Sequence, residues 1–140
     1  MELELETTRL EEGLWLRDAN GRQVRFDAGA AAGGSEEALR PMQMLLGSLV
    51  ACSSIDLVQI LHKQRQSLEK LHVRAIGERR EAVPRVFRRI HLVITASGEV
   101  EASKLARAAE LAVEQYCSVA AMLRPAGVQI TYETHVNGEA

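Results

Sequence analysis

The pattern of apolar and polar positions is dominated by one segment, residues 41–66. Its first two-thirds are apolar on nearly every side, and only Gly47 interrupts a run that is too long for a strand. Pro41 suits the first position of a helix, and the basic end of the segment suits the negative pole of the helix dipole. A helix that is apolar almost all round is buried almost all round. We therefore predict a central, buried helix.

Shorter segments with alternating polar and apolar positions predict strands on both sides of this helix. Before it, we expect strands over residues 2–8, 13–17 and 22–26, with Asn20-Gly21 marking a hairpin turn. A loop over residues 28–34 and a short helical turn at residues 35–38 lead into the central helix. After it, we expect an antiparallel pair over residues 71–81 and 86–96, a helix over 104–115, and a final strand over 128–136. In the second strand of that pair, Arg88 falls on the otherwise apolar face.

This order of elements predicts an α+β fold in which antiparallel sheets surround two central helices. The length of 140 residues fits one domain over residues 1–140. The apolar surface of the helices exceeds what one copy of the sheet can cover. We therefore expect an intertwined homodimer.

Charge and composition exclude several classes of function. The net charge of −2 offers no electrostatic case for binding nucleic acid. Gln43, Asp56 and Gln59 interrupt the apolar segment, which argues against a membrane span. The acidic, alternating N-terminus does not resemble an export signal. Two cysteines in such a chain point to a reducing, cytoplasmic compartment.

Few residues of this chain are candidates for catalysis or for binding a metal or cofactor. We find no cluster of metal ligands, because the four histidines are scattered and neither cysteine has a close cysteine or histidine partner. A phosphate-binding loop and a Gly-x-Ser-x-Gly elbow are also missing. We therefore expect no metal and no bound cofactor. The remaining candidates are Cys52, on the central helix, and Cys117, at the end of the second helix.

Two interpretations of these cysteines stay open. Cysteine is often an ordinary, buried apolar residue. Alternatively, the two helices pack together and the thiols form a redox pair, which requires Cα atoms within about 7 Å. A reactive thiol also needs a nearby cation, because apolar burial raises its pKa. The N-terminal hairpin offers Arg17 and Arg22, whereas Arg25 is less suited because it lies inside a predicted strand.

The residues around both cysteines resemble a known family. Residues 41–46 (PMQMLL) and 52–57 (CSSIDL) are similar to the first cysteine helix of the OsmC/Ohr family, the osmotically inducible and organic hydroperoxide resistance proteins. Residues 115–119 (QYCSV) resemble the second cysteine segment of that family. Between them, residues 63–65, 77–79 and 84–87 follow the pattern of its YhfA-like branch. The resemblance extends over residues 40–136.

This resemblance implies a swapped α+β homodimer with thiol-dependent peroxidase sites at the subunit interface. By similarity, Cys52 attacks an organic hydroperoxide and becomes a sulfenic acid, and Cys117 then forms a disulfide with it. An external dithiol, or a lipoylated protein, resets the pair. The family arginine that activates the thiolate comes from the N-terminal hairpin, which makes Arg17 and Arg22 the candidates here.

One departure from the family pattern keeps alternatives open. The best-studied peroxidases have a glutamate directly after the motif proline, where this chain has Met42, and the YhfA-like branch has its glutamate one residue later, where this chain has Gln43. Gln43 can hydrogen-bond an arginine but does not supply a charge. The alternatives are a non-catalytic protein that binds a hydrophobic ligand at the dimer interface, and a thiol redox sensor.

Overall fold

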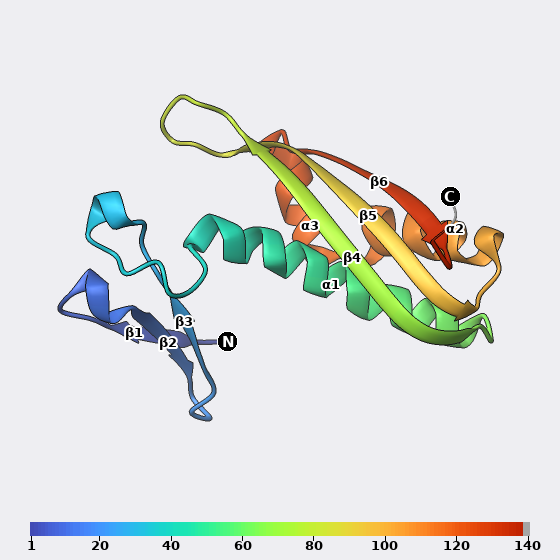
Figure 1. Cartoon of the computed structure of the whole chain (residues 1–140), viewed down its shortest axis with the longest axis horizontal. Helices are drawn as coiled ribbons and strands as arrows, with labels where there is room; N and C mark the ends of the chain where they lie inside the picture. Colours follow the sequence, from blue (N-terminus) through green and yellow to red (C-terminus); the bar gives the residue numbers. More distant parts are fainter. Residues whose placement is uncertain (139–140) are drawn as a thin grey trace. The chain divides into compact units, whose positions relative to one another are not determined.

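The computed structural model describes residues 1–138, which form two compact units. The first unit comprises Met1–Leu45, and the second begins at Leu46. Each unit is described by itself below (Figure 1). The mixture of sheets and helices confirms the predicted α+β class, while the single domain over residues 1–140 stays a prediction.

The first unit is built around a three-stranded antiparallel sheet in the order β1-β2-β3. The predicted hairpin turn lies between β2 and β3, where Gly21 has a φ of 80° and the Asp18 carboxylate accepts the N–H groups of Asn20 and Arg22, each at 2.9 Å. Short 3-10 turns follow β1 and β3. The elements of this unit are β1 (Leu3–Glu6), η1 (Leu10–Glu12), β2 (Leu14–Asp18), β3 (Gln23–Phe26) and η2 (Ala30–Ala32).

The long helix α1 (Pro41–Lys63) begins at Pro41, as predicted. The side chain of Gln43 caps its first turn, because Oε1 accepts the Arg40 N–H at 2.8 Å. Burial in the single chain is limited to one stripe, formed by Leu49, Ser53, Leu57 and Leu61. Burial all round is therefore not reached in the single chain, where Ile55 on another face is 60% exposed, and burial of the other faces by a second copy stays a prediction.

Helix α1 is also long and apolar enough to span a membrane, judged by length and composition alone. The core helix of a soluble protein meets the same test. One such helix is therefore weak evidence for a membrane location.

The second unit contains a three-stranded sheet in the order β4-β5-β6. Strands β4 (Ser67–Arg79) and β5 (Phe87–Glu99) are antiparallel, as predicted, but β6 (Gln129–Val136) runs parallel to β5. The expectation of wholly antiparallel sheets is therefore wrong at this pairing. The physical reason is the connection: a helical crossover between β5 and β6 returns the chain to the same end of the sheet, whereas a tight hairpin would reverse it.

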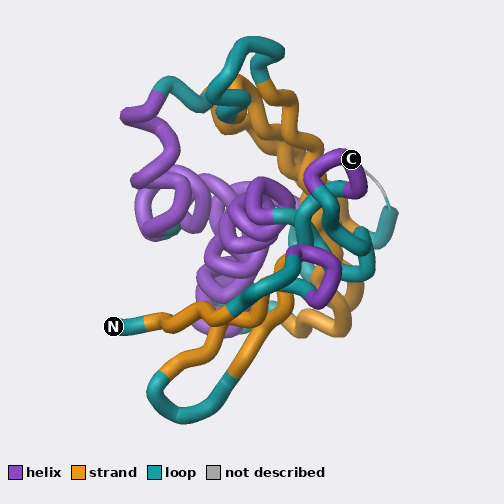
Figure 2. The backbone as a smooth tube through the Cα atoms, turned by 90° about the vertical axis from the view of Figure 1, so that its left-hand side faces the viewer, coloured by secondary structure: helices purple, strands orange, loops and turns teal. Residues whose placement is uncertain are grey.

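Helices cover one face of this second sheet (Figure 2). The crossover consists of α2 (Ala102–Glu110), a π-helical segment η3 (Leu111–Tyr116), α3 (Ser118–Leu123) and a 3-10 turn η4 (Arg124–Ala126). The predicted helix over 104–115 therefore consists of α2 and most of the wider π turn η3, which the apolar pattern does not reveal. The completely buried core residues of this unit are Leu49, Leu57, Leu61, Ile90, Leu92, Ile94, Ala96, Leu105, Ala108, Ala109, Ala112, Val113 and Ala120.

A register shift accounts for Arg88, which alternation places on the apolar face of β5. Arg79 pairs with Phe87, but Glu78 pairs with Arg89, so the ladder skips Arg88. Phe87 is buried, whereas Arg88 is exposed. The irregularity thus keeps the guanidinium out of the core.

Candidate functional site

The two cysteines come together inside the second unit. Cys52 lies on α1 and is partly exposed, and Cys117 lies between η3 and α3 and is only 2% exposed. Their side chains lie close together, so that Cys52 raises the pKa of the Cys117 thiol, and both thiols are free. The structure therefore brings together the two residues that the sequence singled out, with one thiol accessible and the other covered.

Local backbone geometry holds Cys117 at the end of the π turn. Its N–H donates to the carbonyl of Ala112 at 2.9 Å, which is a bond to the fifth residue back. The backbone then becomes extended at Cys117, with φ −67° and ψ 110°. The Cys117 sulfur accepts the N–H of Ala120 at 3.4 Å, so the thiol caps the first turn of α3.

The environment of Cys117 opposes ionisation. Burial raises the pKa of its thiol, and the hydrogen bond and negative charge of Cys52 raise it further. The N–H groups of Ala120 and Val119 act in the opposite direction but do not outweigh these effects. Cys117 is therefore suited to stay a protonated thiol until a partner sulfur becomes electrophilic.

The residue after Cys52 belongs to the buried stripe of α1. This residue, Ser53, is completely buried and donates its hydroxyl to the carbonyl of Leu49 at 2.8 Å. This bond removes the only side-chain polar group of Ser53 from competition for the thiol. Stabilisation of a Cys52 thiolate then depends on a cation from elsewhere.

The other three predicted site residues belong to the first unit, and each has a partner there. Arg17 donates to the Gln23 Oε1 from Nε at 3.2 Å and from a terminal nitrogen at 3.0 Å. Arg22 forms an ion pair with Asp18 at 2.6 Å, and its side chain is 78% exposed. Gln43 caps α1. Their action on Cys52 stays a prediction.

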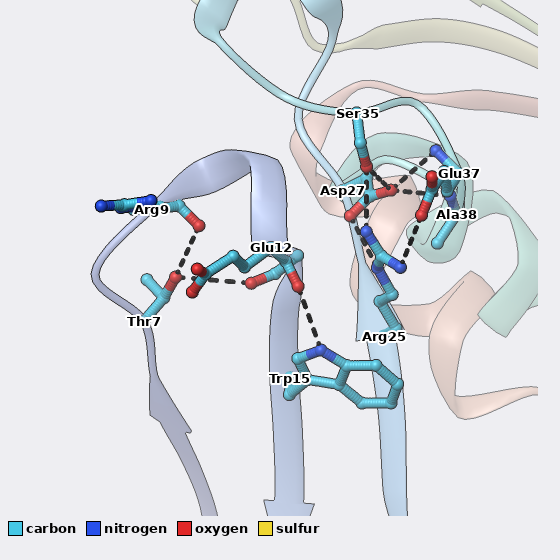
Figure 3. A network of polar contacts seen from close by, with 10 residues as sticks. Thr7, Arg9, Glu12, Trp15, Arg25, Asp27, Ser35, Glu37 and Ala38 are labelled. Atoms are coloured by element: carbon cyan, nitrogen blue, oxygen red, sulfur yellow. Dashed lines mark hydrogen bonds and ion pairs between the residues drawn. The ribbon is translucent and has the colours of Figure 1, made fainter.

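Sequence reasoning missed a polar network at the end of β3 (Figure 3). Asp27 is completely buried, and its carboxylate accepts hydrogen bonds from Ser35 Oγ at 2.9 Å and from the N–H groups of Glu37 and Ala38 at 2.8 Å. Arg25 donates to the same carboxylate at 3.0 Å. Burial raises the pKa of Asp27, but these hydrogen bonds outweigh it and lower the pKa.

This network has two consequences. Residues 35–38 contain no helical turn: residues 37 and 38 form a bend whose N–H groups the Asp27 carboxylate accepts, so the helical turn predicted there is wrong. The Arg25 guanidinium is also paired with Glu37 at 3.0 Å and lies over the ring of Trp15. One sequence feature could have indicated this network: Arg25 and Asp27 are two residues apart, a spacing that places both side chains on one face of an extended chain.

The histidines do not form a metal centre. Within residues 1–138, no group of three or more histidine, cysteine, aspartate or glutamate side chains has a geometry that fits a metal ion. His91 and His135 instead contact the two oxygens of Glu133, at 2.8 Å and 2.7 Å, across β5 and β6. The hydrogen bonds from His91 and then His135 lower the pKa of Glu133.

A surface hollow of about 730 Å³ lies in the first unit. It is lined by backbone and side chains of β1, η1 and β2, including Glu6, Glu12 and Trp15. Neither cysteine lines it. We therefore place the candidate site at the thiol pair rather than at this hollow.

The class of protein follows from comparison with known families. The chain matches the family of OsmC-like proteins over residues 33–133, a stretch that includes both cysteines, and it belongs to that family. The family resemblance of the two cysteine segments is thereby confirmed.

Individual relatives make the position within the family more specific. The chain is 40% identical over 119 residues to protein YhfA of Escherichia coli strain K12, covering 84% of this chain and 85% of YhfA. It is 31% identical to a hypothetical protein from Aquifex aeolicus VF5 with a solved structure (TM-score 0.80, covering 97% and 96% of the two chains). An organic hydroperoxide resistance protein OsmC from Legionella pneumophila shares the fold at 16% identity (TM-score 0.71, covering 95% and 94%).

Proposed function

We propose that this protein is a two-cysteine peroxidase that reduces organic hydroperoxides. The observation that carries the proposal is the contact between a partly exposed Cys52 and a buried Cys117 in a chain of the OsmC-like family. Relatives of the same fold include proteins named for organic hydroperoxide resistance, which supports this class of substrate.

In the first step, the Cys52 thiolate attacks the terminal oxygen of the hydroperoxide. The O–O bond breaks, one oxygen stays on sulfur as a sulfenic acid, and the alkoxide takes up a proton to leave as an alcohol. Cys52 suits this role because its side chain is the more exposed of the two. The apolar surroundings favour a peroxide with an alkyl or aryl group over a small polar one.

In the second step, the Cys117 sulfur attacks the sulfenic sulfur of Cys52. The S–O bond breaks, a disulfide forms, and the hydroxyl group leaves as water with the proton of the Cys117 thiol. The existing contact between the two side chains means that little rearrangement precedes this step. An external dithiol then reduces the disulfide and is itself oxidised to a disulfide. A lipoylated protein is our candidate reductant, and the cytoplasm our candidate compartment.

An arginine is assigned to stabilise the Cys52 thiolate. Arg17 and Arg22 are the candidates, because both lie on the hairpin of β2 and β3 and have largely exposed guanidinium groups. Gln43 is assigned a weaker, neutral role in orienting that arginine. In this scheme, the catalytic rate depends on a charge that the N-terminal hairpin supplies.

We also propose that the protein works as a homodimer. The observation is the long apolar helix α1, of which only one stripe is buried in the single chain. A second copy of the same helix is the occupant that best matches this surface, since closed two-fold pairing covers the same patch on both copies. In such a dimer, the partner subunit covers the site and excludes water from it.

A second candidate function rests on the same apolar surface. If the peroxidase reaction is absent, the exposed apolar face of α1 favours a protein that binds a hydrophobic ligand at the dimer interface. Its distinguishing observation is a lipid that co-purifies with a protein that does not consume peroxide.

The experiment that tests the proposed function follows the consumption of cumene hydroperoxide with dihydrolipoamide as reductant. We expect turnover in the wild type, loss of turnover in Cys52→Ser, and a sulfenic acid that is trapped with dimedone in Cys117→Ser. Ser54→Ala, which leaves both thiols in place, is the control. Turnover no faster than that of free cysteine at the same concentration contradicts the proposal.

A further inference from the structure

A hydrogen bond joins the two ends of the segment from Val113 to Arg124, and Cys117 lies between them. The Arg124 guanidinium donates to the carbonyl of Val113 at 2.8 Å from a partly buried position. Between these two residues the chain passes through the end of the π turn, the extended Cys117 and helix α3. A single side-chain contact therefore joins the two ends of the segment that presents the thiol.

The carbonyl that Arg124 contacts is a particular one. In an α-helix, the carbonyl of Val113 accepts the N–H of Cys117, four residues on. Here that N–H goes instead to Ala112, five residues back, because the segment is π-helical. The Arg124 guanidinium supplies Val113 with the donor that the π register withdraws.

This register decides the direction in which Cys117 points. Each residue of an α-helix turns the chain by about 100°, so a return to α-helical bonding would rotate Cys117 by roughly that angle. Such a rotation moves the thiol away from its contact with Cys52. A bond that favours the π register therefore also favours the contact between the two sulfur atoms.

A second group approaches the same turn from the sheet. The phenol of Tyr132, on β6, lies near Glu114, the residue after Val113, and burial followed by this carboxylate and that of Glu110 raises the pKa of Tyr132. Arg124 is close enough to act on this phenol electrostatically, since its positive charge opposes the rise in the pKa of Tyr132 that burial and the two nearby glutamates cause. The π turn is thus bonded from η4, and Tyr132 of β6 lies beside it.

We infer that Arg124, assisted by Tyr132, is the positioning residue for disulfide formation between Cys52 and Cys117. It does not touch the reacting atoms and acts through the π register. The inference deepens the proposed peroxidase cycle and rests on it for its biological meaning, but its test needs no peroxide.

The test measures the equilibrium between the reduced protein and its disulfide in buffers of glutathione and glutathione disulfide. One glutathione disulfide oxidises the two protein thiols, and two molecules of glutathione leave with the two protons. The ratio of the protein forms gives the effective concentration of one thiol at the other. A residue that only stabilises the fold does so equally in both forms and leaves the effective concentration unchanged. Urea unfolding is measured alongside to detect such a general effect on stability.

We expect Arg124→Gln to lower the effective concentration by about tenfold, because a charge-assisted hydrogen bond to the π turn is lost. Arg124→Lys retains one donor and is expected to stay within about threefold of the wild type. Arg79→Gln is the matched control: Arg79, at the end of β4, donates its Nε to a backbone carbonyl in the same way, that of Arg85 at 2.6 Å. It is expected to behave like the wild type.

Tyr132→Phe keeps the test available if Arg124→Gln does not fold. We expect a decrease of about threefold, because the variant removes the hydroxyl group that lies beside Glu114 and Arg124. An unchanged effective concentration in whichever of these two variants folds overturns the inference. An equal decrease in Arg79→Gln overturns it too. A decrease confined to Arg124→Gln and Tyr132→Phe in a protein that does not consume peroxide supports the inference while refuting the proposed function.

Discussion

Truncation of Ile55 to alanine tests the proposed dimer on the exposed side of α1. Ile55 is 60% exposed in the single chain, although it lies in the middle of the most apolar helix. Complete burial of an isoleucine side chain stabilises a protein by about 1.5–3 kcal/mol. Covering the exposed fraction of Ile55 therefore contributes about 1–2 kcal/mol in each copy.

The effect on assembly follows from symmetry. A two-fold dimer carries the substitution twice, and Ile55→Ala removes about three-quarters of the side-chain carbon atoms. The expected loss is about 1.4–2.7 kcal/mol per dimer, which raises the dissociation constant by about 10- to 100-fold. The variant should still fold, because Ile55 contributes little to the buried stripe of the single chain.

Sedimentation velocity over a range of micromolar concentrations measures this change directly. Ile76→Ala is the matched control, since Ile76 is 46% exposed but lies opposite His91 on the face of the sheet that is turned away from the helices. We expect its dissociation constant to equal that of the wild type. A wild type that sediments as a monomer throughout, or an Ile55→Ala dimer of unchanged stability, refutes the reasoning.

Three further predictions concern the thiols, acid stability and the helix cap. In Cys52→Ala, the pKa of Cys117 should fall toward its ordinary value but stay above it, because burial, its largest cause, remains; the pH dependence of iodoacetamide labelling measures this. The pKa of Glu133 is lowered, so its contribution to stability is present above the ordinary pKa of 4.5 and is lost as the pH falls through the lowered pKa. Glu133→Gln should therefore flatten the pH dependence of the melting temperature in that acidic range. Gln43→Ala should cost about 0.5–2 kcal/mol in urea unfolding by removing the acceptor for the Arg40 N–H, whereas Gln43→Glu keeps that acceptor and should match the wild type.

Much of the fold could be predicted from the sequence because its signals are local. Pro41 starts α1, Asn20-Gly21 turns the first hairpin, and alternation marks the strands. The two cysteine segments were also recognisable from short runs of residues. The proximity of the two thiols agrees with this resemblance, and buried residues precede and follow each cysteine: Leu49 and Ser53 for Cys52, Val113 and Ala120 for Cys117.

Other features depend on partners that are distant in sequence. The π turn before Cys117 involves a guanidinium that lies eleven residues beyond Val113, and no periodicity records that contact. The parallel direction of β6 follows from the helical crossover, which strand patterns do not specify. Likewise, the buried Asp27 is balanced by donors eight to eleven residues away.

The exposed side of α1 illustrates a different limit. An apolar pattern states that a surface avoids water, but it does not state whether the same chain or another copy covers it. The prediction of burial therefore holds for one stripe in the single chain, and burial of the rest of the helix by a second copy stays a proposal.

The most direct test of the two-cysteine cycle is a single turnover with one equivalent of cumene hydroperoxide, stopped by acid and analysed by intact mass. The account predicts stoichiometric cumyl alcohol, a wild type that has lost two hydrogens by forming the Cys52–Cys117 disulfide, and a Cys117→Ser variant that has gained one oxygen on Cys52. Unchanged masses with intact peroxide, or oxidation confined to other residues, would contradict it.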